Sequence, residues 1–177
     1  HCISSAASDV YKRQHLYGVD VHVTVNTLVK EKEIESFKEY LKQLNKIGVD
    51  ALIVQDMGAV EIIKKTVPDM TLHASTQMTV TSLEGVKYLE DMGFSRVVLA
   101  RELSEKEIEH ICKNAKAEIE VFVHGAICMC YSGQCLMSSI LGGRSGNRGR
   151  CAQPCRLPYD LLENGKTVKS EYVLSPK

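Results

Sequence analysis

Short runs rich in β-branched residues alternate with longer amphipathic runs between residues 19 and 123, and this alternation limits the folds open to the chain. Strands are expected at residues 19–26 (VDVHVTVN), 51–55 (ALIVQ), 71–75, 96–100 and 119–123. Helices are expected at residues 31–47, 58–66, 79–92 and 104–114. Apolar strands separated by helices predict a parallel sheet covered by helices.

Two stretches repeat each other at an offset of 45 residues, 44–56 (LNKIGVDALIVQD) and 89–101 (LEDMGFSRVVLAR). Each contains a helix end, a glycine and a buried strand that ends in a charge, so the repeat covers two βα units. Such units form either an open doubly wound sheet or part of a (β/α)8 barrel. No GxGxxG or GxxxxGK(S/T) turn follows any expected strand. The sequence therefore favours an α/β fold that is an incomplete TIM-barrel-like (β/α)8 domain.

We divide the chain into four segments. Residues 1–14 have no strand or helix period and are expected to be a non-native leader, and residues 15–123 hold the βα repeats of the partial barrel. Residues 124–159 form a cysteine-rich insertion after the last complete strand, and residues 160–177 begin a next element that is truncated. With no apolar run of about 18 residues and no signal-peptide pattern, we expect a cytoplasmic protein without a membrane partner.

Polar side chains follow the expected strands at their carboxyl ends, where a barrel places its chemistry. These side chains are Asn26, Gln55, Asp56, His73, Ser75, Gln77, Arg101, Glu102 and His124. From this set, the candidate catalytic residues are Asp56, His73, Gln77, Arg101 and His124. The alternative is that strand ends are solvated and commonly finish in polar residues.

Five of the seven cysteines lie between residues 128 and 155. Cys128 and Cys135 are separated by six residues, Cys135 and Cys151 by fifteen, and Cys151 and Cys155 by three. Four thiolates returning to one region of a cytoplasmic chain predict a metal site made of Cys128, Cys135, Cys151 and Cys155. An iron–sulfur cluster is preferred over zinc, because a zinc ribbon uses two-residue gaps that are absent here. Disulfides and buried free thiols are the remaining alternatives; Cys112, on a helical pattern, is expected to be a small buried hydrophobe.

The cysteine-rich segment has four arginines and no acidic residue, whereas the whole chain balances 22 basic against 22 acidic residues. Arginines suit phosphate recognition, because a guanidinium is a planar and permanently charged fork. Arg144, Arg148 and Arg150 are therefore candidate RNA-binding residues on a glycine-rich loop. The alternative is that these arginines neutralise the metal site or clamp the loop against acidic helices.

A longer set of residues resembles the signature of peptidase family U32, the collagenase-like peptidases. The matching positions, which differ from the signature only in the order around Leu136 and Met137, are Glu120, Phe122, Gly125, Ala126, Ile127, Cys128, Gly133, Cys135, Met137 and Ser138. The run at residues 142–156 (GGRSGNRGRCAQPCR) is similar to the second block of the family, and the resemblance extends over roughly residues 17–177.

The resemblance implies a TIM-barrel-like domain, of which the chain holds about strands three to seven. Family members were long labelled peptidases or collagenases, whereas other branches resemble enzymes that hydroxylate RNA pyrimidines or ubiquinone precursors with a 4Fe-4S cluster. Carried over by position, Cys128, Cys135 and Cys151 resemble cluster ligands. Cys155 is within reach as the fourth, although in some relatives that ligand lies beyond Lys177. Cys130 then resembles a bystander.

Three functions follow from these patterns. The first is cluster-dependent hydroxylation of an RNA pyrimidine, with a small-molecule co-substrate and a possible partner subunit. The second is a peptidase that uses Ser132 or Ser138 with His124 or His73, although no HExxH or GxSxG motif is present. The third is a structural metal site on a barrel whose chemistry lies elsewhere.

Overall fold

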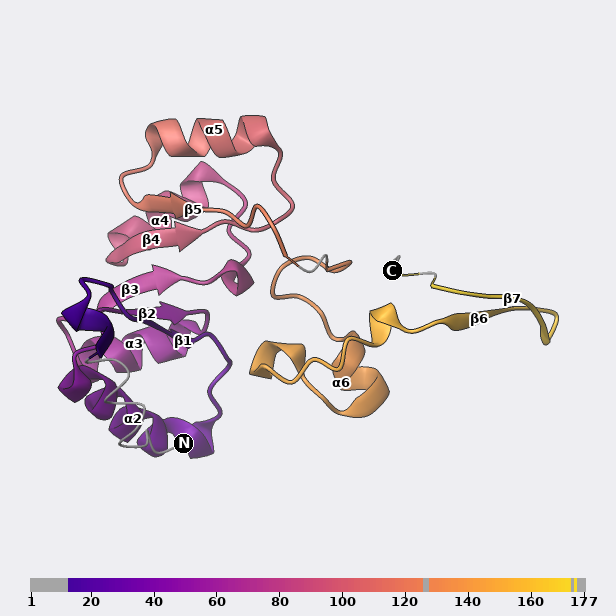
Figure 1. Ribbon diagram of the computed structural model, residues 1–177, viewed down its shortest axis with the longest axis horizontal. Coiled ribbons are helices and arrows are strands. Elements are labelled where there is room, and N and C mark those ends of the chain that lie inside the picture. Colours follow the sequence, from indigo (N-terminus) through magenta and orange to yellow (C-terminus); the bar gives the residue numbers. More distant parts are fainter. Residues whose placement is uncertain (1–12, 126–127, 173, 175–177) are drawn as a thin grey trace.

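A five-stranded parallel sheet is the framework of the molecule (Figure 1). The computed structural model describes residues 13–125, 128–172 and 174. The strands lie in the order in which they occur along the chain: β1 (His22–Val25), β2 (Ala51–Val54), β3 (Thr71–Ala74), β4 (Phe94–Val98) and β5 (Glu118–Glu120). All five predicted strands are therefore present in one parallel sheet, each shorter than or displaced from its predicted range.

Helices connect consecutive strands and pack on one face of the sheet. They are α2 (Ile34–Ile47), α3 (Met57–Thr66), α4 (Leu83–Asp91) and α5 (Glu105–Asn114). Their apolar side chains, such as Leu41, Ile63 and Val86, share one core with Leu52 and Val97 of the strands. A doubly wound sheet reverses its strand order and has helices on both faces. The described strands do neither, so the doubly wound alternative is wrong and the sheet is wound in one direction, as in part of a barrel.

The opposite face of the sheet carries a row of mostly polar side chains. The register between neighbouring strands aligns Thr24, Ile53, His73, Arg96 and Glu118 in one row across the sheet. Arg96 binds Glu118 within this row, with 2.8 Å between Nε and Oε2. Paired residues of parallel strands point to the same face, so this row lies opposite the apolar residues that contact the helices.

The repeat predicted from the sequence is present in the structure. Gly48 and Gly93 follow α2 and α4 with φ of 79° and 84°, in the left-handed region that glycine adopts without strain. β4 begins directly after Gly93, and β2 begins at Ala51, three residues after Gly48. The predicted start of the helix at Thr79 is wrong, because Thr79 takes a left-handed φ of 58° after a 3-10 turn at Thr76–Met78. α4 begins only at Leu83, after Ser82 caps it.

The carboxyl-terminal part of the described chain differs from its prediction. Instead of the start of one truncated element, β6 (Tyr159–Glu163) and β7 (Lys166–Glu171) form an antiparallel hairpin. Asn164 and Gly165 make its turn with φ of 49° and 76°, and Asn-Gly is a strong sequence signal for such a turn. Residues 1–12 of the predicted leader lie outside the described residues. Among the described helices, none is both long and apolar enough to cross a membrane.

Candidate functional site

A cleft of about 1080 Å³ lies between the carboxyl ends of the strands and the cysteine-rich segment. Figure 1 shows this segment, with the short helix α6 (Met137–Gly142), beside the strand ends. All four predicted metal ligands line the cleft, together with the fifth cysteine of the segment: Cys128, Cys130, Cys135, Cys151 and Cys155. The fold therefore brings the cysteines to the edge of the sheet at which the sequence predicts chemistry.

The thiols share the cleft without forming a closed ligand set. Cys128 and Cys151 are exposed, whereas Cys130, Cys135 and Cys155 are half-buried. Within residues 13–125, 128–172 and 174, no group of three or more His, Cys, Asp or Glu side chains is close enough to hold a metal ion. Desolvation raises the pKa of the Cys130 thiol, and the neighbouring Cys135 and Cys128 raise it further. An all-thiol donor set fits an iron–sulfur cluster or zinc.

The first half of the cysteine-rich segment binds the end of β4 through Ser132. This serine is 1% exposed, and its backbone N–H donates to Glu102 Oε1 at 3.0 Å. Its hydroxyl lies 3.2 Å from Glu102 Oε2 and accepts a hydrogen bond from Arg101 Nε at 3.1 Å. Thr79 Oγ1 donates to the carbonyl oxygen of Ser132 at 2.6 Å. Ser132, which lies between Cys130 and Cys135, is thus held at three points: its backbone N–H, its hydroxyl and its carbonyl.

Gly133 allows this close approach. Its φ is +73°, and a Cβ added here would lie 2.1 Å from the carbonyl oxygen of Gln77. Backbone therefore meets backbone at a distance that no other residue permits. Gly133 was part of the family signature, and the structure gives the physical reason for a glycine at this position.

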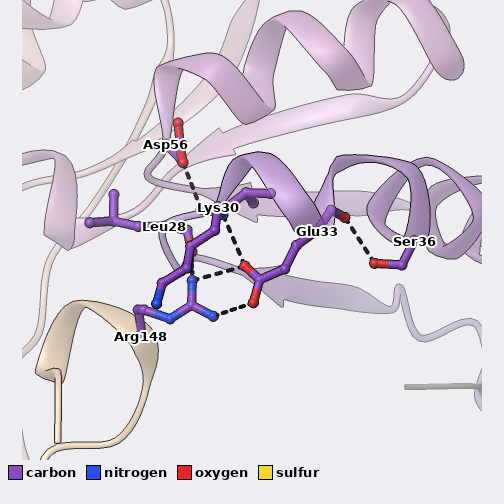
Figure 2. Close-up of polar contacts among 7 residues, drawn as sticks. Leu28, Lys30, Glu33, Ser36, Asp56 and Arg148 are labelled. Carbon is purple, nitrogen blue, oxygen red and sulfur yellow. Dashed lines mark hydrogen bonds and ion pairs between the residues drawn. The ribbon is translucent and has the colours of Figure 1, made fainter. Parts of the chain in front are cut away.

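The second half of the segment binds the ends of β1 and β2. The carbonyl oxygen of Asn147 accepts hydrogen bonds from the Leu28 N–H at 3.1 Å and from Gln55 Nε2 at 2.9 Å. Arg148 forms a bidentate pair with Glu33, at 2.7 Å for Nη2 to Oε1 and 3.0 Å for Nη1 to Oε2. Its Nη1 also donates to the Leu28 carbonyl at 2.6 Å (Figure 2). Arg148 holds the pKa of the Glu33 carboxyl below its usual value.

The three predicted RNA-binding arginines do not share one environment. The guanidinium of Arg148 is occupied by Glu33 and Leu28, which is the clamping role that the sequence left as an alternative. Arg144 and Arg150 are exposed, and Arg144 Nε donates to the Arg150 carbonyl at 3.2 Å. Contact with RNA phosphates stays a prediction for Arg144 and Arg150.

Of the predicted catalytic residues, Gln77, Arg101 and His124 line the cleft with the cysteines. Asp56 does not line it, because its carboxylate serves the backbone. Its Oδ1 accepts from Gly58 N at 2.8 Å and caps α3, and its Oδ2 accepts from Val29 N at 2.8 Å. Asp56 follows the end of β2, as the sequence predicts, but its contacts indicate a structural role.

His73 also lies outside the cleft lining. It is 5% exposed on the polar face of the sheet, with its ring centroid 4.7 Å from that of His22. Its Nδ1 is buried without a hydrogen-bond partner among the described residues. Burial lowers the pKa of His73 to about 4, and the charges of Arg96 and His22 act in the same direction. The imidazole is therefore neutral near pH 7.

The serines considered as peptidase nucleophiles are both buried. The Ser132 hydroxyl lies against Glu102, and Ser138 Oγ accepts from the Ala152 N–H at 2.9 Å. Neither serine bonds a histidine among the described residues. Cys112, predicted to be buried, is exposed on α5.

Sequence reasoning missed three residues that fix the cleft: Glu33, Thr79 and Asn147. Nothing in the sequence distinguishes Glu33 from the other acids of its helix. Thr79, in a left-handed turn, binds the Ser132 carbonyl through its hydroxyl. Asn147 contributes its backbone carbonyl, which accepts from Gln55.

The singly wound parallel sheet with a thiol-lined cleft at its strand ends defines an α/β protein whose fold is consistent with part of a barrel. The sequence profile described as peptidase family U32 matches residues 5–177, and the chain therefore belongs to this family. The chain is 47% identical over 165 residues to the Escherichia coli 23S rRNA 5-hydroxycytidine C2501 synthase, covering 92% of this chain and 25% of that protein. It is 37% identical over 147 residues to tRNA hydroxylation protein P1 of Bacillus subtilis, covering 83% of this chain and 35% of that protein.

A collagenase of Porphyromonas gingivalis is also similar, at 30% identity over 187 residues, which cover 96% of this chain and 44% of that protein. The solved structure of the U32 peptidase Mk0906 matches 66% of this chain and 49% of its own, with a TM-score of 0.53 and 22% identity. That similarity supports the fold. The chain spans between a quarter and just under half of the curated relatives named here.

Proposed function

We propose that the protein hydroxylates a pyrimidine in RNA with the help of an iron–sulfur cluster. The observation that carries this proposal is the convergence of five cysteines on one cleft at the carboxyl ends of the strands. Of the three curated relatives named above, the two with the higher identity carry names that refer to hydroxylation of rRNA and tRNA. We also propose a cytoplasmic location, because rRNA and tRNA substrates of this kind are found there.

We further propose that the complete protein closes the sheet into a (β/α)8 barrel with the cysteine-rich segment as an insertion at its mouth. The sequential strand order and the helices on one face support this architecture. In a closed barrel, the polar row that includes His73 and Arg96 faces the interior. The cleft then lies at the end of the barrel where enzymes of this fold place their active sites.

Cys128, Cys135 and Cys151 are the proposed ligands of a 4Fe-4S cluster, with Cys155 as the fourth ligand present in this chain. Such a cluster, when bound, supplies one-electron redox chemistry. Zinc is the alternative occupant of the same thiols. Arg101 also lines the cleft, and its Nη2 donates toward the Cys130 carbonyl at 3.5 Å. Its positive charge offsets part of the net negative charge of a thiolate-ligated cluster.

The remaining polar residues of the cleft bind the substrate in this proposal. Gln77, Arg101 and His124 are the side chains placed to contact the reacting base or a small co-substrate that provides the oxygen atom. Arg144 and Arg150, on the exposed rim of the cysteine-rich segment, bind RNA phosphates. Contacts of both kinds are needed, because phosphate contacts position an RNA and base contacts select the nucleotide.

The test is mass spectrometry of rRNA and tRNA from a strain that lacks the full-length protein. We expect one pyrimidine to lose the mass of a single oxygen atom, and the loss to be reversed by the wild-type protein but not by Cys135→Ala. Unchanged RNA in the deletion strain would overturn the proposal.

Two results would favour the other functions. Peptide cleavage that survives the removal of all iron would favour the peptidase, the activity in the name of the Porphyromonas relative. Stoichiometric, colourless zinc in the purified protein would favour a structural metal site.

A further inference from the structure

The cysteine-rich segment is attached to the sheet at two separate places, one for each half of its cysteines. Ser132 lies between Cys130 and Cys135, and Arg148 lies three positions before Cys151. We call the contacts of Ser132 with Glu102, Arg101 and Thr79 the first anchor. We call the contacts of Asn147 and Arg148 with Leu28, Gln55 and Glu33 the second anchor.

The first anchor has little freedom to move. Ser132 is 1% exposed and is bonded through its N–H, its hydroxyl and its carbonyl. Gly133 then touches the backbone of Gln77. A buried polar group that loses its partners pays the full cost of desolvation, so these bonds hold the turn in one position.

The second anchor combines backbone and charged contacts. Arg148 donates to Glu33 through both nitrogens of its fork, and this bidentate geometry fixes the orientation as well as the distance. Asn147 contributes only its backbone carbonyl, which bridges Leu28 and Gln55. Figure 2 shows the Arg148 fork reaching from the turn at Gly146–Arg148 to Glu33, which ends the 3-10 turn Glu31–Glu33 directly before α2.

Between the anchors, the contacts of the chain are mostly within the segment itself: α6 forms there, and Ser138 Oγ accepts from the Ala152 N–H at 2.9 Å. Cys135 and Cys151 are separated by fifteen residues that include Gly142, Gly143, Gly146 and Gly149. A glycine-rich loop of this length visits many conformations, and closing it around one ligand costs entropy. Two anchors that restrain the loop in advance reduce that cost.

We propose that Ser132 and Arg148 are positioning residues that hold the two halves of the cysteine set over the strand ends, so that both halves meet at one metal centre. This inference rests on the proposed cluster site. Each anchor acts on its own half, the first on Cys128 and Cys135 and the second on Cys151 and Cys155. Glu102 and Glu33 are the partners through which they act.

The experiment compares Arg148→Ala with Arg144→Ala in the full-length protein. Both variants remove one positive charge from the same loop, but only Arg148 bonds Glu33 and Leu28. Hydrogen exchange is measured on the metal-free protein at two adjacent amides. The Leu28 amide, which donates to Asn147, should exchange about fivefold faster in Arg148→Ala. The Val29 amide, which donates to Asp56, should be unchanged.

The second readout is the retention of iron after reconstitution with Fe²⁺ and sulfide, followed by chelator challenge. We expect Arg148→Ala to release iron faster than wild type, Arg148→Lys to be intermediate because one ammonium replaces a fork, and Arg144→Ala to match wild type. Ser132→Ala should also release iron faster, with the Leu28 amide unchanged and the amide of residue 132 exchanging faster.

The outcomes separate this inference from the proposed function. Equal iron release by wild type, Arg148→Ala and Ser132→Ala would overturn the positioning role. Equally fast exchange of the Leu28 amide in Arg144→Ala and Arg148→Ala would also overturn it. A wild-type protein that takes up no iron would overturn the cluster proposal and the positioning role with it.

Discussion

At the scale of single residues, the carboxylate of Asp56 illustrates how position and role can differ. It accepts two backbone N–H groups at the start of α3 and one from Val29, so it links the first and second βα units. We expect Asp56→Ala to lower the free energy of unfolding by about 1–2 kcal/mol, the upper part of the range for a lost helix cap, because the bond to Val29 is lost as well. Urea denaturation of the full-length protein measures this change.

The matched control is Asp69→Ala, which removes an exposed carboxylate from the turn after α3. It should change the free energy of unfolding by less than about 0.5 kcal/mol. If Asp56→Ala abolished RNA hydroxylation while the unfolding midpoint stayed at the wild-type value, the catalytic role predicted from the sequence would be restored.

His73 makes the stability of the fold depend on pH. Its pKa is about 4 in the folded protein against 6.5 for an unperturbed histidine, because burial and the charges of Arg96 and His22 oppose protonation. As the pH falls from 6.5 to 4, the unfolded chain binds the proton first. The contribution of neutral His73 to the free energy of unfolding should therefore be complete above pH 6.5. It should be lost as the pH falls toward 4, by up to about 3 kcal/mol.

The measurement is a series of urea unfolding curves between pH 7.5 and pH 4.5 for wild type, His73→Asn and His110→Asn. The free energy of unfolding of His73→Asn should fall much less than that of wild type over this pH range. His110 is exposed on α5, so its replacement should leave the decrease unchanged. A wild-type stability that stays level from pH 6.5 to pH 5 would contradict the low pKa.

At the scale of the elements, the sequence predicts the strands and helices well and their contacts less well. The strands are short β-branched runs, and the helices between them have apolar spacings of three and four, so both have local signals. The bounds shift where tertiary contacts decide, as at Thr79, whose hydroxyl binds the carbonyl of Ser132. The hairpin at residues 159–171 had a local signal, the Asn164-Gly165 pair.

The candidate site was predictable in its chemistry and only partly in its geometry. The cysteines and their common location follow from spacing and from the parallel sheet. The pairing of Arg148 with Glu33 joins residues 115 positions apart, and no pattern in either segment selects that partner. The sequence could place arginines beside a metal site, but only the packed structure separates the clamping arginine from the two exposed ones.

Gly133 connects the cysteine-rich element to the sheet, and its replacement is a test of that contact. Gly133→Ala adds a Cβ 2.1 Å from the Gln77 carbonyl at a φ of +73°. We expect the free energy of unfolding to fall by about 3 kcal/mol, because backbone strain and displacement of the turn act together. Gly143→Ala is the matched control, because its φ is +64° but nothing lies within 4 Å of the added carbon. It should cost about 1 kcal/mol.

Urea unfolding measures both glycine variants, and exchange of the Ser132 amide shows whether the turn has moved. Gly133→Ala should speed that exchange, whereas Gly143→Ala should not. Equal effects of the two variants on stability and on exchange would mean that the close approach to Gln77 does not hold the segment.

At the scale of the whole molecule, charge is balanced overall and concentrated locally. The chain carries 22 basic and 22 acidic residues, yet residues 124–159 contain four arginines and no acid. Arg148 is paired with Glu33, so of the three arginines predicted to bind RNA only Arg144 and Arg150 are exposed. The fourth arginine, Arg156, is also exposed and follows the last cysteine. RNA binding by this protein should therefore depend on two particular arginines and not on net charge.

The salt dependence of binding to a single-stranded RNA tests this expectation. Each phosphate contact contributes a slope of about −0.7 in log K against log salt, so the double variant Arg144→Ala/Arg150→Ala should be shallower by about 1.4 than wild type. Lys42→Ala/Lys113→Ala removes the same charge from exposed positions on α2 and α5, and its slope should equal that of wild type. Parallel slopes for wild type and both double variants would show that the arginine rim does not contact phosphates. If the slopes of both double variants became shallower by the same amount, RNA binding would depend on net charge. Specific phosphate contacts of Arg144 and Arg150 would then be excluded.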